Sequence, residues 1–369
     1  MSYKITHLTS AHPRYDTRIF IKECSSLAKK YQVNLVVADG LGDEEKNGIS
    51  IYDVGKGEGR LDRIFSTTKR VLKKAIELDS DIYHMHDSEL IPIGLKLRKL
   101  GKKVVFDSHE DVPKELMGKP YLNKTLLKII SIMFSIYEKI NLKKFDYIVT
   151  ATPTLKDKFL KINSNVVDVN NFPIIEELNS NISWDKKENA ICYVGVISKS
   201  RGIKEMVKAL EYYPKAKLNL GGKFNQKSLQ EEVENYDGWK SVNFLGYLSR
   251  AEVVSVLERS RAGLVTLHDI SNYKDALPVK MFEYMASSLP VISSNNKLWQ
   301  SIIEKHQCGV CVDPMNPKEI ADAIKYIIEN PKEAQKMGEN GKKAVVEVYN
   351  WANEEKKLLK IYQDIVDEI

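Results

Sequence analysis

Residues 275–292, DALPVKMFEYMASSLPVI, place the carboxylates Asp275 and Glu283 on either side of an expected helix start. The pattern predicts that Asp275 lies in a loop, that a helix carrying Glu283 opens near Val279, and that a buried strand follows at 290–293. Such a junction offers free backbone N–H groups to a phosphate, and carboxylates beside it can accept hydrogen bonds from hydroxyls. The segment therefore indicates a sugar-nucleotide site, although a capped amphipathic helix before a strand explains it equally well.

The end of this segment, FEYMASSLPVI, resembles the F-E-Y-M-A-x-G-x-P-V-I of retaining glycosyltransferases of family 4, which have the GT-B fold. The two carboxylates are similar to the E-x7-E pattern of that family. Asp275 stands in place of the first Glu, and Ser288 stands in place of the usual Gly. The resemblance implies that Asp275 holds the hydroxyls of the donor sugar, as a catalytic residue, and that Glu283 holds the ribose.

Strand-like and helix-like segments alternate along the 369 residues, with a break at 166–173. This alternation predicts an α/β protein with parallel sheets, and the length fits two domains. The resemblance implies the GT-B arrangement of two Rossmann-like, doubly wound domains that face each other across a cleft. We expect an acceptor-side domain at 1–170 and a nucleotide-sugar-binding domain at 171–347. We also expect a C-terminal helix within 348–369 that crosses back to the first domain.

Residues 193–202, YVGVISKSRG, read as a strand end, a glycine-containing loop and a helix start. Gly195 permits close backbone approach, and Arg201 can place a forked cation on a phosphate. The loop is similar to the family's G-R-L-x-x-x-K-G, except that Val follows Gly195 where Arg is usual. The resemblance implies that Arg201 grips the donor diphosphate, either alone with backbone N–H groups or with Lys280 or Lys199. A plain turn is the alternative.

The segment 244–247, FLGY, resembles the family's F-x-G, whose backbone commonly meets the nucleotide base. The resemblance implies that Gly246 lets the base approach and that Tyr247 flanks it. A glycine that merely ends a strand is the alternative interpretation.

Residues 10–18, SAHPRYDTR, join the first expected strand to a helix expected at 17–30. Asp16 or Thr17 could cap this helix. Two arginines in one such loop exceed what a turn needs, so we interpret Arg14 and Arg18 as contacts for the acceptor or the diphosphate. A structural network of Asp16 with Arg18 is the alternative.

Histidines follow or occupy two further expected strands. His109 lies within 105–111, VFDSHED, the segment that ends another expected strand. The resemblance implies that His109 touches the donor sugar as a catalytic residue. A packed or capping histidine is the alternative. In 81–86, DIYHMH, strand alternation puts His84 and His86 on one face. A metal pair is conceivable there, but the sequence shows no third ligand, so we expect structural polar packing.

The sequence favours neither a metal nor a cofactor. Residues 79–81 spell D-x-D, the manganese signature of another glycosyltransferase class, but they precede a strand. The single C-x-x-C at 308–311 lacks a second ligand pair at zinc-finger spacing. No G-x-G-x-x-G follows the first strand, which weighs against a Rossmann oxidoreductase. The nucleotide sugar would be a substrate, and no nucleic-acid partner is expected.

All of the net charge of +6 comes from the N-terminal part of the chain, because residues 1–170 hold 29 Lys and Arg against 22 Asp and Glu. This excess indicates an anionic partner, or only a lysine-rich background. The most apolar expected helix, within 120–145, is flanked by lysines and is either buried or laid on a membrane interface; we favour partial membrane contact. No signal-peptide pattern is seen. We expect a cytoplasmic protein, peripheral at the inner face of the membrane.

The resemblance as a whole implies a hexosyltransferase-type reaction. A sugar would pass from a nucleotide sugar, in the first place a UDP-sugar, to a hydroxyl of a saccharide or lipid-linked saccharide, with retention and without a metal. Because one loop cation is missing and the first acid is shortened, a non-catalytic sugar-nucleotide-binding or scaffold protein is the alternative.

Overall fold

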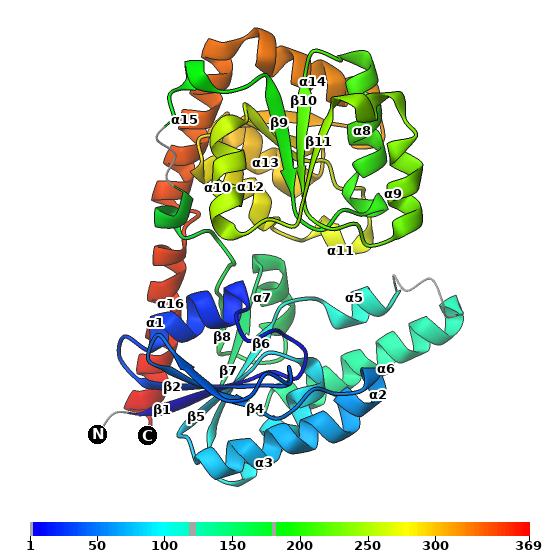
Figure 1. Cartoon of the computed structure of the whole chain (residues 1–369). Coiled ribbons are helices and arrows are strands. Elements are labelled where there is room, and N and C mark those ends of the chain that lie inside the picture. The colour runs from blue at the N-terminus through cyan, green and yellow to red at the C-terminus, as the bar shows by residue number, and fades with distance from the viewer. Residues whose placement is uncertain (1–2, 118–122, 179–181) are drawn as a thin grey trace. The chain divides into compact units, whose positions relative to one another are not determined.

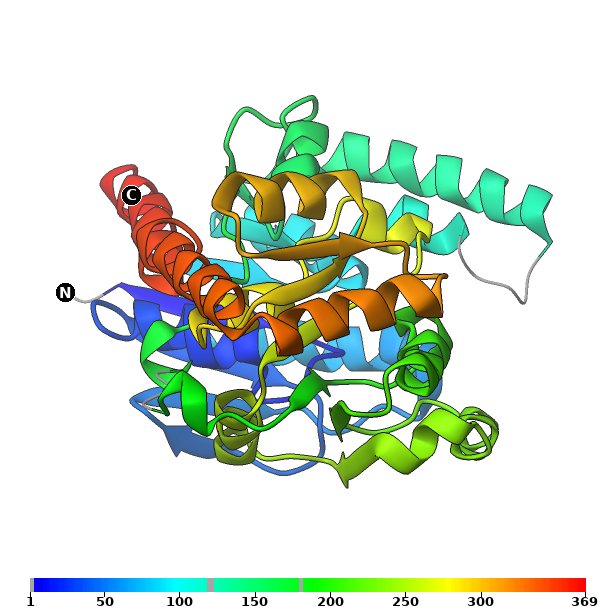
Figure 2. The same ribbon diagram turned by 90° about the horizontal axis from the view of Figure 1, so that it is seen from above.

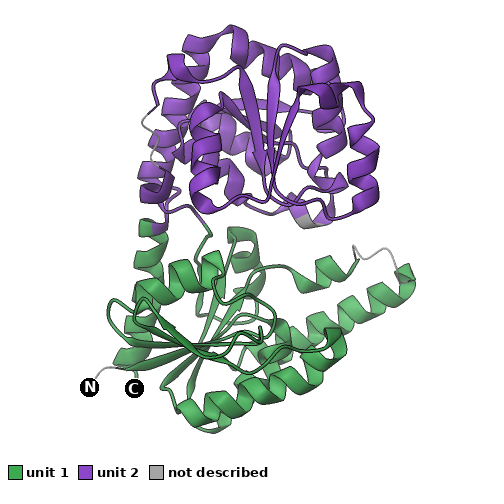
Figure 3. Cartoon of the chain, viewed as in Figure 1, with its two compact units in different colours: residues 1–171, 352–369 green, residues 172–351 purple. Residues whose placement is uncertain are grey.

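The computed structural model describes residues 3–117, 123–178 and 182–369 (Figure 1). The chain divides into two compact units, residues 1–171 with 352–369, and residues 172–351 (Figure 3). Each unit is an α/β structure built on one sheet.

Unit 1 contains an eight-stranded sheet of order β3-β4-β2-β1-β5-β6-β7-β8, parallel except for the antiparallel pair β3–β4. Its strands are β1 (Lys4–Leu8), β2 (Gln32–Val37), β3 (Glu44–Lys46), β4 (Ile49–Asp53), β5 (Ile82–Met85), β6 (Lys103–Ser108), β7 (Tyr147–Thr150) and β8 (Val166–Asp168). Its helices are α1 (Ser25–Leu27), α2 (Gly59–Asp62), α3 (Thr68–Leu78), α4 (Ile91–Lys99), α5 (Val112–Met117), α6 (Lys124–Leu142) and α7 (Pro153–Phe159), with π-helical turns η1 (Thr17–Cys24) and η2 (Arg63–Thr67) and the 3-10 turn η3 (Ser88–Leu90).

Unit 2 contains a six-stranded parallel sheet of order β11-β10-β9-β12-β13-β14. Its strands are β9 (Ala190–Val194), β10 (Lys217–Gly221), β11 (Val242–Gly246), β12 (Ala262–Val265), β13 (Val291–Ser294) and β14 (Gly309–Val312). Its helices are α8 (Ile203–Tyr212), α9 (Lys227–Glu234), α10 (Arg250–Arg259), α11 (Ser271–Lys274), α12 (Val279–Ala286), α13 (Lys297–His306), α14 (Pro317–Glu329) and α15 (Pro331–Glu347), with 3-10 turns η4 (Ile175–Leu178), η5 (Trp184–Lys186), η6 (Lys199–Arg201) and η7 (Asp237–Ser241).

The central strands of both sheets read as apolar runs because helices cover both faces of a parallel sheet. All five residues of β9 are buried, and so are the last five residues of β2. The carboxyl ends of parallel strands share one edge, which is where ligands bind in such sheets. The loops after β1, β5 and β6 therefore meet at one edge of unit 1, and those after β9 and β10 meet at one edge of unit 2.

The last helix, α16 (Trp351–Asp367), packs on unit 1 from residue 352 onward. The Tyr362 hydroxyl lies 2.7 Å from Nδ1 of His84 on β5, and Lys103 Nζ at the start of β6 lies 2.8 Å from Glu368 Oε2. The C-terminal segment thus supplies side chains to the core of unit 1.

Helix α6 exposes its apolar side chains. Leu127 and Leu142 are buried, but six others are between 45% and 65% exposed and are called the α6 apolar face: Leu126, Ile129, Ile132, Met133, Ile136 and Ile140. Two views show the N-terminal half of α6 extending away from the sheet of unit 1 (Figures 1 and 2). Residues 118–122, which include the start of the helix expected at 120–145 and one flanking lysine, lie outside the described residues. Within the described parts of the chain, no helix is long and apolar enough to cross a membrane.

Candidate functional site

Two glycines at the edge of unit 2 bring backbone and side chains into close contact. Gly195 follows β9 with φ +146°, and a Cβ there would lie 2.3 Å from Cε and 2.7 Å from Nζ of Lys280. Gly222 follows β10 with φ +133°, and a Cβ there would lie 1.7 Å from the Gly195 carbonyl oxygen. At Gly222 the backbone of Gly195 excludes a side chain, whereas at Gly195 the contact is with the flexible end of Lys280 and the positive φ is what favours glycine.

Arg201 and Lys280 both approach Gly195. The Arg201 Nη1 atom would lie 3.7 Å from a Cβ at position 195, so both cationic side chains lie beside the same backbone. Burial lowers the pKa of Lys280, although Glu283 opposes the shift. Burial also disfavours charge on Arg201, but hydrogen bonding to Tyr193 and Tyr273 raises its pKa. Two partly desolvated cations at one glycine make a setting that favours an anion.

The structure also bears on which lysine accompanies Arg201. Lys280 lies on the first turn of α12 against Gly195, whereas the Lys199 side chain is exposed. The residue before α12 is Pro278, which has no side-chain hydrogen bond to the first helical N–H groups. Backbone donors and Lys280 are therefore presented together at this helix start.

The two predicted carboxylates lie on either side of that helix start. Asp275 ends the short helix α11, and Glu283 lies in the second turn of α12. Oε1 of Glu283 accepts a hydrogen bond of 2.6 Å from Nη1 of Arg250, whose Nε donates to Glu177 Oε2 at 3.1 Å. Sequence reasoning missed Arg250. The only indication in the sequence was that Arg250 follows Ser249 in the Ser249–Glu252 capping box, in the first turn of α10. A capping box predicts a helix start, but it does not predict what the next side chain contacts.

Gly246 and Tyr247 end the neighbouring strand β11. Gly246 has φ +66°, and a Cβ there would meet no atom within 4 Å, so the space over this backbone is open. Tyr247 is 75% exposed, and Lys223 Nζ lies 5.1 Å from its ring centroid. Both residues present accessible surface at the same sheet edge as Gly195, since β9, β10 and β11 are consecutive neighbours.

Arg14 lies within ion pairs of unit 1. It is buried, its Nε and Nη2 donate to Asp39 at 2.8 and 2.7 Å, and its Nη1 donates to Glu44 at 2.8 Å. These carboxylates raise the pKa of Arg14 further above its usual range. The guanidinium interpreted as a ligand contact is thus engaged by carboxylates of the same unit.

Arg18 and Asp16 have separate partners. Arg18 donates through Nε and Nη2 to Asp107 at 2.8 and 2.7 Å, and through Nη1 to the Val169 carbonyl at 2.6 Å. Asp16 Oδ1 instead accepts from the backbone N–H groups of Arg18 and Ile19 at 2.8 and 3.0 Å. The alternative of an Asp16–Arg18 side-chain network is therefore corrected: Asp16 caps η1, and the carboxylate partners of the Arg18 guanidinium are Asp107 and Glu23.

His109 is positioned by the same Asp107. Its Nε2 lies 2.8 Å from Asp107 Oδ2, and its side chain is 20% exposed. Burial opposes ionisation of Asp107, but Arg18 and His109 hold its pKa well below the usual range. Asp107 is therefore an anion that fixes one face of the His109 ring and leaves part of the ring accessible.

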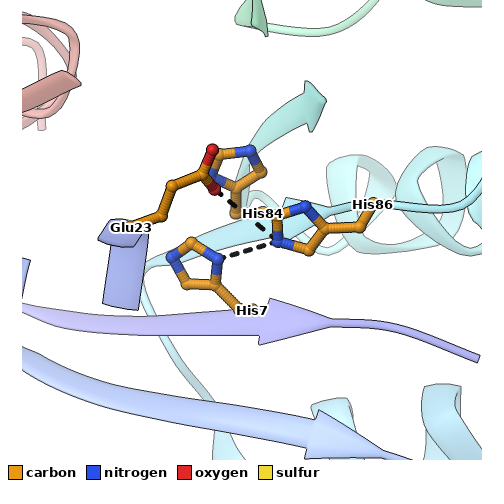
Figure 4. A group of neighbouring side chains, drawn as sticks. All are labelled: His7, Glu23, His84 and His86. Carbon is orange, nitrogen blue, oxygen red and sulfur yellow. Dashed lines mark hydrogen bonds and ion pairs between the residues drawn. The ribbon is translucent and has the colours of Figure 1, made fainter. Parts of the chain in front are cut away.

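The sequence showed no third ligand for His84 and His86, but in the structure two further side chains with metal-binding atoms lie beside them. The structure adds His7 from β1 and Glu23 from η1 to this pair (Figure 4). The group combines two strands and a helical turn that are separated in the sequence by up to 79 residues, which spacing rules for metal motifs do not cover. Strand alternation directs His7 to one face of β1. That His7 lies beside His84 follows only from the register of β1 with β5.

Comparisons with known proteins identify both halves of the chain. Residues 20–170 match the family described as Glycosyltransferase Family 4, and residues 174–344 match the family described as Glycosyl transferases group 1. Two uncharacterized glycosyltransferases of Methanocaldococcus jannaschii are similar in sequence. One is 25% identical over 249 residues, covering 62% of this chain and 61% of that protein. The other is 24% identical over 308 residues, covering 77% and 75%.

In structure, the chain is similar to the Anabaena protein HepE in complex with UDP-glucose. The TM-score is 0.74 at 14% sequence identity, and the match covers 98% of this chain and 99% of that chain. This likeness and the two parallel-sheet units confirm the expected GT-B fold class. The chain belongs to the glycosyltransferases of family 4.

Proposed function

We propose that the protein transfers a sugar from a nucleotide sugar, which we take to be a UDP-sugar, to a hydroxyl of a saccharide or lipid-linked saccharide. The observation that carries this proposal is the convergence of Arg201, Lys280 and the start of α12 on Gly195. Two cations, the N–H groups at a helix start and a side-chain-free backbone are what a diphosphate needs. The complex of HepE with UDP-glucose supports the choice of donor.

Charge stabilisation of the leaving group is the main catalytic contribution in this proposal. Negative charge develops on the diphosphate as the bond to the sugar breaks, and donors that are already in place stabilise it without reorganisation. Lys280 is partly buried and its surroundings lower its pKa, and an incoming diphosphate would favour the charged ammonium group. The positive end of α12 acts in the same direction.

The carboxylates then orient the donor. We assign Asp275 to the hydroxyls of the transferred sugar and Glu283 to the ribose, with Gly246 and Tyr247 at the base. The contact of Glu283 with Arg250 supports a fixed carboxylate, because a charge-assisted hydrogen bond limits its rotamers. Arg250 is a positioning residue in this scheme.

His109 is assigned to the donor sugar, with retention at the reacting carbon. Its ring is oriented by Asp107 at 2.8 Å. The leaving diphosphate assists deprotonation of the acceptor hydroxyl, so no dedicated side-chain base is required. Arg14, Asp16 and Arg18 act on the acceptor side by holding the loop after β1 in place, because their side chains are engaged with unit 1 and the start of η1.

The acceptor is assigned to the lipid-linked class, presented at an anionic membrane surface. The support is the α6 apolar face, which is exposed together with the lysines of the same helix and its C-terminal end: Lys124, Lys128, Lys139, Lys143 and Lys144. An apolar face flanked by lysines is typical of a helix that lies in a membrane interface. The protein would then act peripherally at the inner face of the membrane.

The test is a panel of nucleotides and nucleotide sugars with the full chain. If UDP binds, a free UDP concentration of a hundred times its dissociation constant should add about 2.7 kcal/mol to the unfolding free energy. UDP release from one UDP-sugar on addition of a saccharide acceptor is the expected result. Binding of UDP-sugars without release of UDP for any acceptor would instead favour a non-catalytic binding protein, which the exposed Val196 in place of a second loop cation makes worth testing.

A further inference from the structure

Four side chains with metal-binding atoms converge in the interior of unit 1. They are His7 on β1, Glu23 on η1, and His84 and His86 on β5, and one nitrogen or oxygen atom of each lies within 4.8 Å of the others (Figure 4). His7, Glu23 and His84 have no solvent-exposed surface, and His86 is 4% exposed. We call this group the His3Glu cluster.

The register of the sheet creates the cluster. His7 and His84 are direct partners in the parallel pair β1–β5, and His86 lies two residues further along the same face. The His7–His84 and His84–His86 ring centroids are each 4.6 Å apart. Glu23 comes from η1, and π-helical turns are frequent at functional sites. A cluster built from three elements is therefore held rigidly before any ligand binds.

Several polar atoms of the cluster have no hydrogen-bond partner among the described residues. They are Nε2 of His7, Nε2 of His84 and both carboxylate oxygens of Glu23. Buried polar atoms are normally hydrogen-bonded, because an unmet donor or acceptor costs about 1–3 kcal/mol. The atoms of His84 and Glu23 are those that an ion could meet, and they indicate that the cluster lacks a binding partner; the nitrogen of His7 that faces His86 is Nδ1, so its Nε2 is not counted.

The outer ring nitrogens of two histidines are held as they are in metal sites. Nδ1 of His84 lies 2.7 Å from the Tyr362 hydroxyl, and Nδ1 of His86 lies 3.2 Å from Asp107 Oδ2. Metal-ligating histidines almost always donate their second N–H to such a group, which fixes the tautomer and leaves the other nitrogen to the ion.

The spacing of the inner atoms also fits an ion. Nδ1 of His7 and Nε2 of His86 are 2.9 Å apart, and Nε2 of His86 lies 4.0 Å from Glu23 Oε2. In a tetrahedral site, two ligands that each lie about 2.1 Å from the ion are about 3.4 Å apart, so the two nitrogens would move apart by about 0.5 Å on binding. The His7–His86 contact can therefore be a hydrogen bond without the ion and a pair of ligands with it.

The charge balance of the cluster favours a cation. The nearest cationic atom to Glu23 is Arg18 Nε at 3.2 Å, but Arg18 already makes two hydrogen bonds to Asp107. Two buried carboxylates, Glu23 and Asp107, therefore share one guanidinium, and a divalent ion would supply further positive charge beside Glu23.

We propose that His7, Glu23, His84 and His86 bind one divalent first-row transition ion, with Zn²⁺ the ion that three imidazoles and a carboxylate suit. Because the cluster is buried, the ion has a structural role, joining β1, β5 and η1. It also acts on His109, since His86 is a ligand that contacts Asp107, which in turn orients His109. The proposal does not depend on the donor or acceptor assigned above.

The first test measures metal in the full chain, produced in zinc-supplemented cells and purified without a metal-affinity step. Elemental analysis after unfolding should find about one zinc ion per chain. Refolding with Co²⁺ should give visible absorption bands that saturate at the same stoichiometry. A chain that is metal-free in every preparation and shows no Co²⁺ bands after refolding would overturn the proposal.

The second test locates the ion. Glu23→Gln and His84→Gln remove one ligand each with little change in volume, and His306→Gln in unit 2 is the matched control. We expect both ligand variants to lose metal at least tenfold and the control to keep it. Tyr362→Phe covers the case in which these variants misfold, because it keeps all four ligands and should weaken binding by about 10–100-fold. Full metal content in folded Glu23→Gln and His84→Gln would place the ion elsewhere and overturn the assignment.

Discussion

Each unit has an arginine at the edge of its sheet, and the two arginines differ in the groups that surround their charge. In unit 1, Arg18 is buried and makes a two-bond contact with Asp107, so its charge is matched within the unit. In unit 2, Arg201 has tyrosine hydroxyls as neighbours and a second cation, Lys280, beside the same glycine. An arginine in the helical turn after a strand is thus a structural element in one unit and a candidate ligand contact in the other. The difference lies in where the nearest carboxylate is, and four mutational or binding experiments and one chelation experiment follow from it.

The largest expected effect is on the stability of unit 1. Arg18→Met should lower its unfolding free energy by about 3–5 kcal/mol, because it leaves the buried Asp107 carboxylate without its main counter-charge. Denaturant unfolding followed by circular dichroism measures the change. Arg60→Met, at an exposed position of α2, is the control and should shift stability by less than about 0.5 kcal/mol. An Arg18 variant as stable as the control would mean that Asp107 is protonated or otherwise compensated.

The second effect should appear in ligand binding and leave stability unchanged. Arg201→Ala should weaken UDP binding by about 2–5 kcal/mol, since it removes a partly buried charge from the proposed diphosphate site. Calorimetry with UDP measures this loss, and Lys199→Ala, at the exposed neighbouring position, should bind UDP normally. Near-normal affinity and turnover in Arg201→Ala would rule out the diphosphate assignment. A large loss of stability in Arg201→Ala would mean that Arg201, like Arg18, has a structural role.

A third experiment separates the two carboxylates of unit 2. Glu283→Gln should weaken the binding of UDP itself by about 1.5–3 kcal/mol, because the ribose loses a charged hydrogen-bond acceptor. Asp275→Asn should leave UDP binding intact and reduce turnover, because it concerns the transferred sugar. Equal losses of UDP affinity in both variants would contradict this division of roles.

The sequence predicted the parts of the molecule that depend on local pattern. The alternation of strand-like and helix-like segments predicted the two parallel sheets, and the pattern of residues 275–292 predicted the start of α12 near Val279. Ser288, where the family has Gly, takes the left-handed conformation with φ +55°. The backbone conformation is thus one that glycine favours, although the residue is a serine. These features are encoded within a few neighbouring residues.

Partners that come from distant strands could not be predicted. Asp107 as the partner of Arg18 and His7 as the neighbour of His84 both depend on strand order and register, which a single sequence does not define. The loop after β1 therefore looked like a ligand site because its counter-charges, such as Asp39, lie on other elements.

A smaller effect is expected at the membrane. The full chain should pellet with anionic liposomes and be released by high salt, because each lysine near an anionic surface contributes about 1 kcal/mol and exposed charges are screened. Aspartate at both Ile132 and Met133 on the α6 apolar face should abolish pelleting. Leu61→Asp, at an exposed apolar position of α2, is the control. Equal behaviour with neutral and anionic liposomes, and good turnover on a soluble sugar, would favour a soluble acceptor.

The smallest expected effect is that of a chelator on transfer. We expect EDTA added to the folded protein to leave the transfer rate unchanged, because Arg201, Lys280 and the start of α12 supply the charge that a metal ion supplies in other enzymes. An ion in the His3Glu cluster should not respond either, since its ligands are buried and exchange requires opening of unit 1. Refolding in EDTA separates the two units: it should lower the unfolding midpoint of unit 1 and leave UDP affinity, a property of unit 2, unchanged. If EDTA stops transfer by the folded chain and Mn²⁺ restores it, the charge in the donor site comes from a metal ion, and the contrast between the two units no longer holds.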